Sequence, residues 1–212
     1  MGAKTWMLVY ATGSASEALT RCAGSLDRQA SARLAATLFP SEKLEPLPDG
    51  ELSYTNPPED ELFIACYPGV SIIAAFDFAI DNPSQLPSQF IAAGTDQAVY
   101  LHAMHSVVDW FAFAVWEKGK LVRALSLSPE NGVIEDIGQK LAFELPYWNG
   151  EHPVDDPEDE LEEDERYPFA FHPLELGEEA LKEFFGYQLE GFVDAALLQP
   201  ETVPLLRFRR SQ

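Results

Sequence analysis

The segment from Tyr100 to Ser128 constrains the fold of this chain more than any other part of the sequence. It contains two runs of aromatic, branched and small apolar residues, Trp110–Trp116 and Leu121–Leu127, and neither run contains proline. Such runs favour β-strands. Between them lies Lys118-Gly119, which supplies the glycine that a two-residue hairpin turn requires. We therefore predict a β-hairpin.

The expected pairing of Glu117 with Lys120 determines which side chains share a face of this hairpin. One face would carry Trp110, Ala112, Ala114, Trp116, Leu121, Arg123, Leu125 and Leu127. The other would carry Phe111, Phe113, Val115, Val122, Ala124 and Ser126. Both sets are largely apolar, which is typical of strands covered on both sides. The hairpin is therefore predicted to lie inside its sheet.

Further apolar runs predict an α+β fold, with a mixed, largely antiparallel sheet flanked by helices. Strands are expected at 4–10, 62–67, 71–78 and 98–104, with weaker ones at 51–54 and 141–145, and helices at 26–39 and 178–190. In the second helix, Glu178 and Glu179 suit the first turn and Gly191 can end it.

The 212 residues are expected to form a single domain, residues 1–212, with an acidic flexible excursion at about 151–166. Ten of the fifteen residues from Glu151 to Glu165 are acidic and none is Lys or Arg. Charge repulsion and the lack of apolar area leave little to offset the entropy of ordering such a run. The basic end, LLRFRRSQ, either returns to meet an acidic surface or frays.

The net charge of −21 argues against binding to nucleic-acid phosphates and favours a basic protein partner. No apolar run approaches the roughly 20 residues that a membrane helix needs, so no membrane association is expected. Lys4 and the short apolar run after it are a poor match to a signal peptide. Two cysteines allow only one disulfide, which favours a reduced, cytoplasmic location. The oligomeric state is left open.

Three residues, His102, His105 and Asp109, have the spacing H-x2-H-x3-D. Imidazole and carboxylate are ligands for zinc, iron or manganese. On a helix the three would share a face, but in a strand His102 and His105 point to opposite faces unless the strand bends. The pattern also lacks H-E-x-x-H or paired C-x-x-C motifs. We therefore favour buried histidines with hydrogen bonds to the backbone, and expect no metal and no cofactor.

Asp109 stands just before the hairpin, where the chain must turn at Ser106–Val108. An Asp in this position accepts hydrogen bonds from turn amides, and we expect His105 to bond to it across the turn. Ser106 beside His105 invites a nucleophile interpretation, but without a G-x-S-x-G elbow it is better explained as a turn residue.

A second group of charged residues surrounds the hairpin. Arg123 is an isolated cation among apolar positions, and Glu135 and Asp136 lie between isoleucines. A charge inside a sheet must be paired or reach solvent, so an ion pair is favoured over a catalytic use. The candidate pocket residues, none assigned as catalytic, are His102, His105, Asp109, Arg123, Glu135, Asp136 and His172.

Several segments together suggest a family. They are MGAKTWMLVY at 1–10, YLHAMHSVVDWFAFAVW at 100–116, SLSP at 126–129, IEDIG at 134–138 and FHPLELGE at 171–178. With these motifs the chain resembles an uncharacterised actinobacterial family, a domain of unknown function, over nearly its whole length. The resemblance implies a non-exported bacterial protein and brings no activity or cofactor.

The function is therefore unknown from sequence, and three classes are open for a soluble cytoplasmic bacterial protein. The leading one is a protein-interaction or regulatory, immunity-like domain with a basic partner. The second is a small-molecule-binding protein with a pocket near the central hairpin, close to Arg123 and His105. The third, less favoured because an enzyme is not the preferred interpretation, is a metal-dependent hydrolase-like enzyme using His102, His105 and Asp109.

Overall fold

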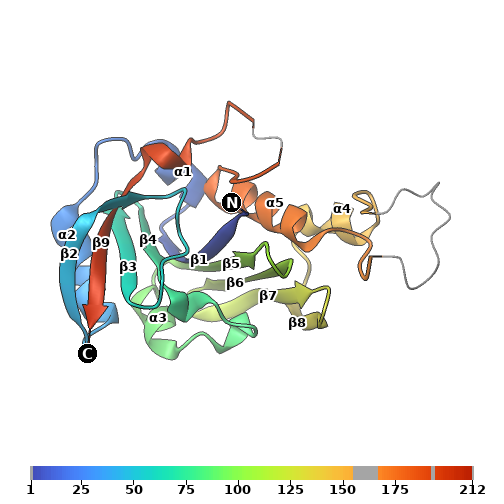
Figure 1. Cartoon of the computed structure of the whole chain (residues 1–212), viewed down its shortest axis with the longest axis horizontal. Coiled ribbons are helices and arrows are strands. Elements are labelled where there is room, and N and C mark those ends of the chain that lie inside the picture. The colour runs from blue at the N-terminus through green and yellow to red at the C-terminus, as the bar shows by residue number, and fades with distance from the viewer. Residues whose placement is uncertain (1, 155–166, 192–193, 212) are drawn as a thin grey trace.

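The computed structural model describes residues 2–154, 167–191 and 194–211, and within them the strands form one nine-stranded sheet in the order β2-β9-β3-β4-β1-β5-β6-β7-β8 (Figure 1). All neighbouring strands are antiparallel. The strands are β1 (Lys4–Ala11), β2 (Lys43–Glu51), β3 (Glu61–Tyr67), β4 (Val70–Ala74), β5 (Ala98–His105), β6 (Trp110–Glu117), β7 (Lys120–Ser128), β8 (Gly132–Gly138) and β9 (Pro204–Ser211). The expected excursion at about 151–166 falls largely outside the described residues.

The predicted α+β class, with its mixed sheet, is wrong, because the described chain is mostly one antiparallel sheet with a few short helices. The helices are α1 (Ala15–Thr20), α2 (Arg28–Leu38), α3 (Ser88–Ala93), α4 (Leu145–Trp148) and α5 (Pro173–Phe185), with 3-10 turns η1 (Phe76–Phe78), η2 (Pro83–Gln85), η3 (Ala142–Glu144) and η4 (Pro200–Thr202). Only α2 and α5 exceed ten residues. The long apolar runs form strands, which their aromatic and branched residues favour.

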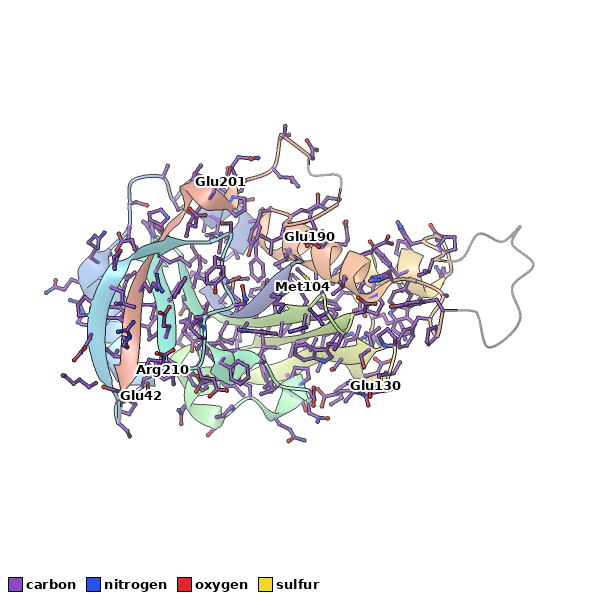
Figure 2. The ribbon with its side chains drawn as sticks, viewed as in Figure 1. Glu42, Met104, Glu130, Glu190, Glu201 and Arg210 are labelled. Atoms are coloured by element: carbon purple, nitrogen blue, oxygen red, sulfur yellow. The ribbon has the colours of Figure 1, made fainter. Side chains whose placement is uncertain are left out.

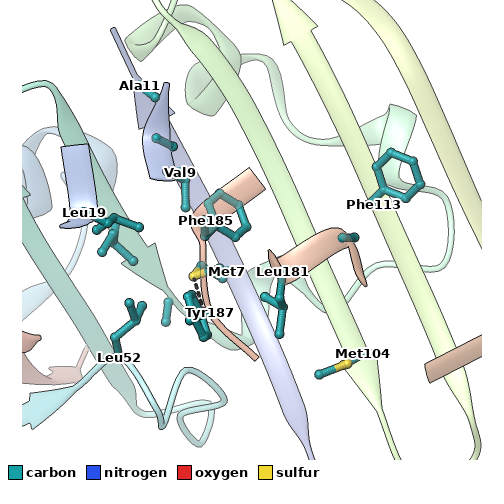
Figure 3. Close-up of a cluster of buried hydrophobic side chains, with 14 of the residues drawn as sticks. Met7, Val9, Ala11, Leu19, Leu52, Met104, Phe113, Leu181, Phe185 and Tyr187 are labelled. Carbon is teal, nitrogen blue, oxygen red and sulfur yellow. Dashed lines mark hydrogen bonds between the residues drawn. The ribbon is translucent and has the colours of Figure 1, made fainter. Parts of the chain in front are cut away.

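Two hydrophobic layers cover the two faces of the sheet. On one face α1 and α5 pack over side chains such as Met7, Val9 and Phe113 (Figure 3). On the other face α2 and α3 pack over Leu8 and Tyr10. Because β1 is covered on both sides, its residues are apolar in succession rather than alternating, as expected for an interior strand.

The predicted hairpin is present, and Glu117 pairs with Lys120 as expected. The predicted faces of β7 are wrong, however, because the register shifts between Val115 and Trp116, where Trp116 pairs with Leu121 but Val115 pairs with Arg123. The additional residue on β7 is a β-bulge, and a shift of one residue exchanges the faces of a strand. Arg123 therefore shares a face with Phe113, not with the tryptophans.

Four further boundaries differ from those predicted. The weaker strand expected at 51–54 lies earlier in the chain, as β2. The last strand after the hairpin lies at β8 rather than at 141–145, where the chain forms η3 and α4. The predicted strand at 71–78 ends at Ala74, and η1 follows. Helix α5 begins at Pro173 rather than at 178, and the His172 side chain caps its N-terminus. The helix ends before Gly186, whose φ of 78° is a conformation that glycine adopts readily. Gly177 lets this helix approach the sheet, because an added Cβ would lie 3.1 Å from Met104 Sδ and from a Phe111 ring carbon.

The basic C-terminal segment forms β9, inserted between β2 and β3, so it returns to the sheet rather than fraying. Arg210 on this strand binds Glu42 and Asp77 and lies over the ring of Phe39; Figure 2 shows Glu42 beside Arg210. Arg207 pairs with Glu61 in the same way. Within the described residues, no helix combines the length and apolar character needed to cross a bilayer.

Candidate functional site

His102 lies at the centre of the sheet and is fully buried under α5. Its Nε2 lies 3.0 Å from the Gly177 carbonyl oxygen, which can only accept, so Nε2 carries the proton. Nδ1, 2.7 Å from Thr5 Oγ1, then accepts from the hydroxyl. Burial lowers the pKa of His102 to about 4, against the opposing effect of its backbone hydrogen bonds. Both ring nitrogens are thus occupied, and His102 joins β5 to α5.

His105 points to the opposite face, as alternation along β5 predicts. Its ring stacks on Trp6, with centroids 5.6 Å apart, and its Nδ1 accepts from the Val107 amide at 3.3 Å. Burial and the charge of Lys4 lower the pKa of His105. None of the described contacts joins His105 to Asp109, so the predicted bond between them is wrong. The turn carries Asp109 toward α5 instead.

Asp109 has a positive φ of 47°, a conformation that Asp tolerates better than most residues. Its Oδ2 lies 3.5 Å from His172 Nε2 and accepts from the Tyr167 hydroxyl at 3.4 Å. The rings of Tyr167 and His172 stack, and His172 Nδ1 accepts from the Leu174 amide at the start of α5. Burial and the Asp109 charge raise the pKa of Tyr167. This group connects the turn between β5 and β6 to the N-terminus of α5.

Arg123 is fully buried, and its guanidinium donates hydrogen bonds to four residues. It binds both carboxylate oxygens of Glu144, the Asp136 carboxylate, and the carbonyl oxygens of Ala124 and Ile137. Burial would lower the pKa of Arg123, but the hydrogen bonds and charges of Glu144 and Asp136 outweigh it and raise that pKa. The arrangement holds η3 against the sheet, so its role is to stabilise the fold.

Glu135 is directed away from this network. Its carboxylate accepts from the Ser84 amide at 2.9 Å and from the Ser84 hydroxyl, which attaches η2 to β8. The seven candidate residues therefore fall into separate groups rather than one pocket, and of the seven only His172 lines one of the principal clefts between described residues. Across the same residues, no three His, Cys, Asp or Glu side chains are grouped so that they could hold a metal ion.

A cleft of about 560 Å³ runs along α5, and we name it the α5 cleft. It is lined by Tyr147, His152, His172, Leu174, Glu175, Glu178, Glu179, Gln188, Glu190 and Gly191. Four of these residues are glutamates and none is Lys or Arg. The rings of Tyr147 and His152 stack at one side, with centroids 4.2 Å apart. The α5 cleft is therefore acidic and bordered by aromatic rings.

Glu178 is the unusual residue of the α5 cleft, because it is only 8% exposed. Its Oε2 accepts from the Leu189 amide at 2.7 Å, whereas Oε1 has no hydrogen-bond partner in the part of the chain that the structure describes. The pKa of Glu178 is raised to about 7, mainly by burial and also by the charge of Glu190. Hydrogen bonding to the Leu189 and Glu190 amides opposes this rise. A buried carboxylate oxygen without a partner is costly and attracts a cation or a proton.

Sequence reasoning missed Glu178 as a site residue. Its position four residues after Leu174 on α5 shows only that it faces the same side of the helix as that residue. Its burial arises because the chain turns back at Gly186 and lays Leu189 against it. The signal that could have found it is an acid placed within the apolar stripe formed by Leu174, Leu181 and Phe185.

A second cleft, of about 690 Å³, adjoins the first, and we name it the N-terminal cleft. It is lined by Gly2, Ala3, Lys4, Glu51, Ser53, Tyr54, Asn56, Val107, Gln188, Leu189, Glu190, Gln199, Pro200 and Glu201. Gln188 and Glu190 line both clefts. Figure 2 shows Glu190 and Glu201 toward the same side of the molecule.

Comparison with known proteins identifies the family of this chain. Residues 5–208 match a family of unknown function (DUF6928), which covers most of the chain. No curated protein and no solved structure matches the chain. The expected relationship to a family of unknown function is thereby confirmed, while the match does not test the expected actinobacterial source.

Proposed function

The chain belongs to the DUF6928 family of unknown function, and we propose that it is a protein-interaction domain whose α5 cleft binds a cationic group of a basic partner. The observation that carries the proposal is the buried Oε1 of Glu178, unpartnered among the described residues, in a cleft lined by four glutamates and by no Lys or Arg. A partner's cation would supply the missing donor.

Electrostatics of the whole chain support the same function. With a net charge of −21, the protein attracts basic molecules over a distance that depends on ionic strength. Such long-range attraction raises the association rate and also promotes non-specific binding. The specific contact would be made at Glu178, because the ion pair formed there is shielded from water.

The test uses tetralysine as the probe and tetraglutamate as its charge-reversed control, with binding followed by NMR chemical shifts at low salt. We expect tetralysine to shift amides of α5 and of residues 187–191, and tetraglutamate to shift none. Glu178→Gln should weaken tetralysine binding about tenfold, the size of a lost buried charge-assisted hydrogen bond.

Glu183→Gln is the matched control, because Glu183 is exposed on the same helix and lines neither cleft. It removes the same charge and should change the affinity less than about twofold, as expected for an exposed charge. Equal losses in the two variants would mean that only the overall charge attracts the peptide, and would contradict a specific site.

A further inference from the structure

The two clefts are neighbours, because Gln188 and Glu190 line both. These residues belong to the segment that leaves α5 at Gly186. An occupant of the α5 cleft that extends past this segment therefore enters the N-terminal cleft. Two neighbouring clefts can accept successive side chains of an extended polypeptide.

The geometry at Glu178 distinguishes between the two common cationic side chains. A guanidinium binds a carboxylate best through two parallel hydrogen bonds, one to each oxygen. Here Oε2 is already bonded to the Leu189 amide, so Oε1 is the oxygen that lacks a partner among the described residues. An ammonium group is a compact charge that can direct a single N–H to one oxygen. The site therefore favours lysine over arginine.

The N-terminal cleft has a different character. Tyr54 and Val107, two of its lining residues, are 43% and 74% exposed, and Ala3, Leu189 and Pro200 lie among them. Val107 occupies the turn between β5 and β6, next to the exposed Val108. Covering exposed apolar area on binding is favourable. An apolar side chain of the occupant would gain this favourable contribution.

From these observations we infer that the partner of this domain presents an extended segment in which a lysine side chain reaches Glu178 in the α5 cleft and a neighbouring apolar side chain occupies the N-terminal cleft against Tyr54 and Val107. The inference rests on the proposed function and adds the chemistry of the partner. Charge complementarity selects such a peptide over a second copy of this chain, because two copies would each carry −21.

The experiment selects binders from a displayed library of random linear peptides against the full chain. We expect the enriched peptides to share a lysine and an apolar residue at a constant spacing. The best peptide is then synthesised with the lysine replaced by arginine and, separately, with the apolar residue replaced by serine. Each replacement should weaken binding about tenfold, and because both changes are in the peptide, the fold of the protein is unaffected.

Protein variants locate the two contacts. Glu178→Gln should abolish the preference for lysine over arginine, and Val107→Ser should abolish the effect of the apolar residue in the peptide. The controls are Glu183→Gln and Val133→Ser, which alter exposed residues that line neither cleft. Equal binding of the lysine and arginine peptides, or equal effects of Val107→Ser and Val133→Ser, would overturn the inference.

The outcomes separate this inference from the proposed function. Enriched peptides that are basic but show no lysine preference, or no apolar residue at constant spacing, would overturn the inference and leave the proposed function standing. Failure of the library to yield any specific binder would also overturn it. If tetralysine does not bind at the α5 cleft either, both proposals fail.

Discussion

Arg123 on β7 and Glu144 at the end of η3 form a fully buried, two-point ion pair, with Nε–Oε1 2.8 Å and Nη2–Oε2 2.6 Å. Glu144 Oε1 also accepts from the Leu141 amide at 2.7 Å. The pair thus connects β7, which lies next to the edge strand β8, to the segment that follows β8 in the chain. A buried charge that has lost its partner is strongly destabilising, whereas a well-packed apolar pair in its place is not.

We therefore expect Glu144→Gln to lower the free energy of unfolding by about 3 kcal/mol, because it leaves the Arg123 charge only partly compensated by Asp136. The double variant Arg123→Met/Glu144→Met should lose less than the sum of the losses in Arg123→Met and Glu144→Met alone. Urea denaturation of wild type and these four variants checks both statements. Additive losses would show that the two side chains act independently.

His102 should make stability depend on pH in a defined window. Its folded pKa of about 4 lies below its ordinary 6.5, so between these values the unfolded chain binds a proton that the native chain does not. The stability from His102 is therefore complete above pH 6.5 and falls as the pH drops toward 4. His102→Leu leaves Thr5 and Gly177 without their partner and should cost about 2–4 kcal/mol above pH 6.5.

The cost of His102→Leu should shrink by up to about 3 kcal/mol as the pH falls to 4, because the variant has no imidazole to protonate. Urea denaturation of both proteins across this range measures the difference. His152→Leu, at an exposed histidine, is the control and should cost less. A pH-independent difference between wild type and His102→Leu would contradict a buried neutral imidazole.

Glu178 should have the opposite dependence on pH. Its folded pKa of about 7 exceeds its ordinary 4.5, so the native chain keeps a proton between these values that the unfolded chain releases. Its contribution is therefore complete below pH 4.5 and is lost as the pH rises through 7. Relative to wild type, Glu178→Gln should become more stable by up to about 3 kcal/mol between pH 4.5 and pH 8.

Other titratable groups around Glu178 are present in both proteins, so comparing the two largely cancels their contributions. They are Glu175, Glu179, Tyr187, Glu190, His152 and His172. Glu183→Gln should show no such gain at high pH. A parallel pH profile for wild type and Glu178→Gln would refute the assignment of an unpartnered, buried carboxylate.

Arg210 on β9 tests whether the planar guanidinium matters where it binds Glu42 and Asp77. Its Nη2 donates to Glu42 Oε1 at 2.6 Å, and its guanidinium lies 4.5 Å from the centre of the Phe39 ring. Arg210→Lys keeps the charge but loses the two-point geometry and the stacking, and should cost about 1–3 kcal/mol.

Arg209→Lys is the control for this change, because the Arg209 side chain is 56% exposed and its Nε lies as far as 4.0 Å from Asp60 Oδ2. It should shift the free energy of unfolding by less than about 0.5 kcal/mol, as surface substitutions usually do. Similar melting temperatures for the two lysine variants would show that charge alone holds β9.

The sequence alone determined several interior strands of this protein. Aromatic and branched residues without proline, together with Gly119 at the turn, were enough to predict β6, β7 and the pairing of Glu117 with Lys120. Continuous apolar runs likewise located β1, β3 and β5, because a strand covered on both faces needs apolar residues in succession. These are local signals, readable from neighbouring residues.

Tertiary structure decided which side chains meet. The bulge at Val122 turned Arg123 toward Glu144, a partner 21 residues away that no local pattern indicates. The sequence predicts His172 as a candidate site residue, but its pairing with Asp109 depends on the direction of the turn between β5 and β6. The sequence predicts Glu178 only as a residue of the first helical turn, and its burial depends on the chain folding back after Gly186. Burial and pairing depend on contacts between distant segments, and sequence periodicity carries no information about them.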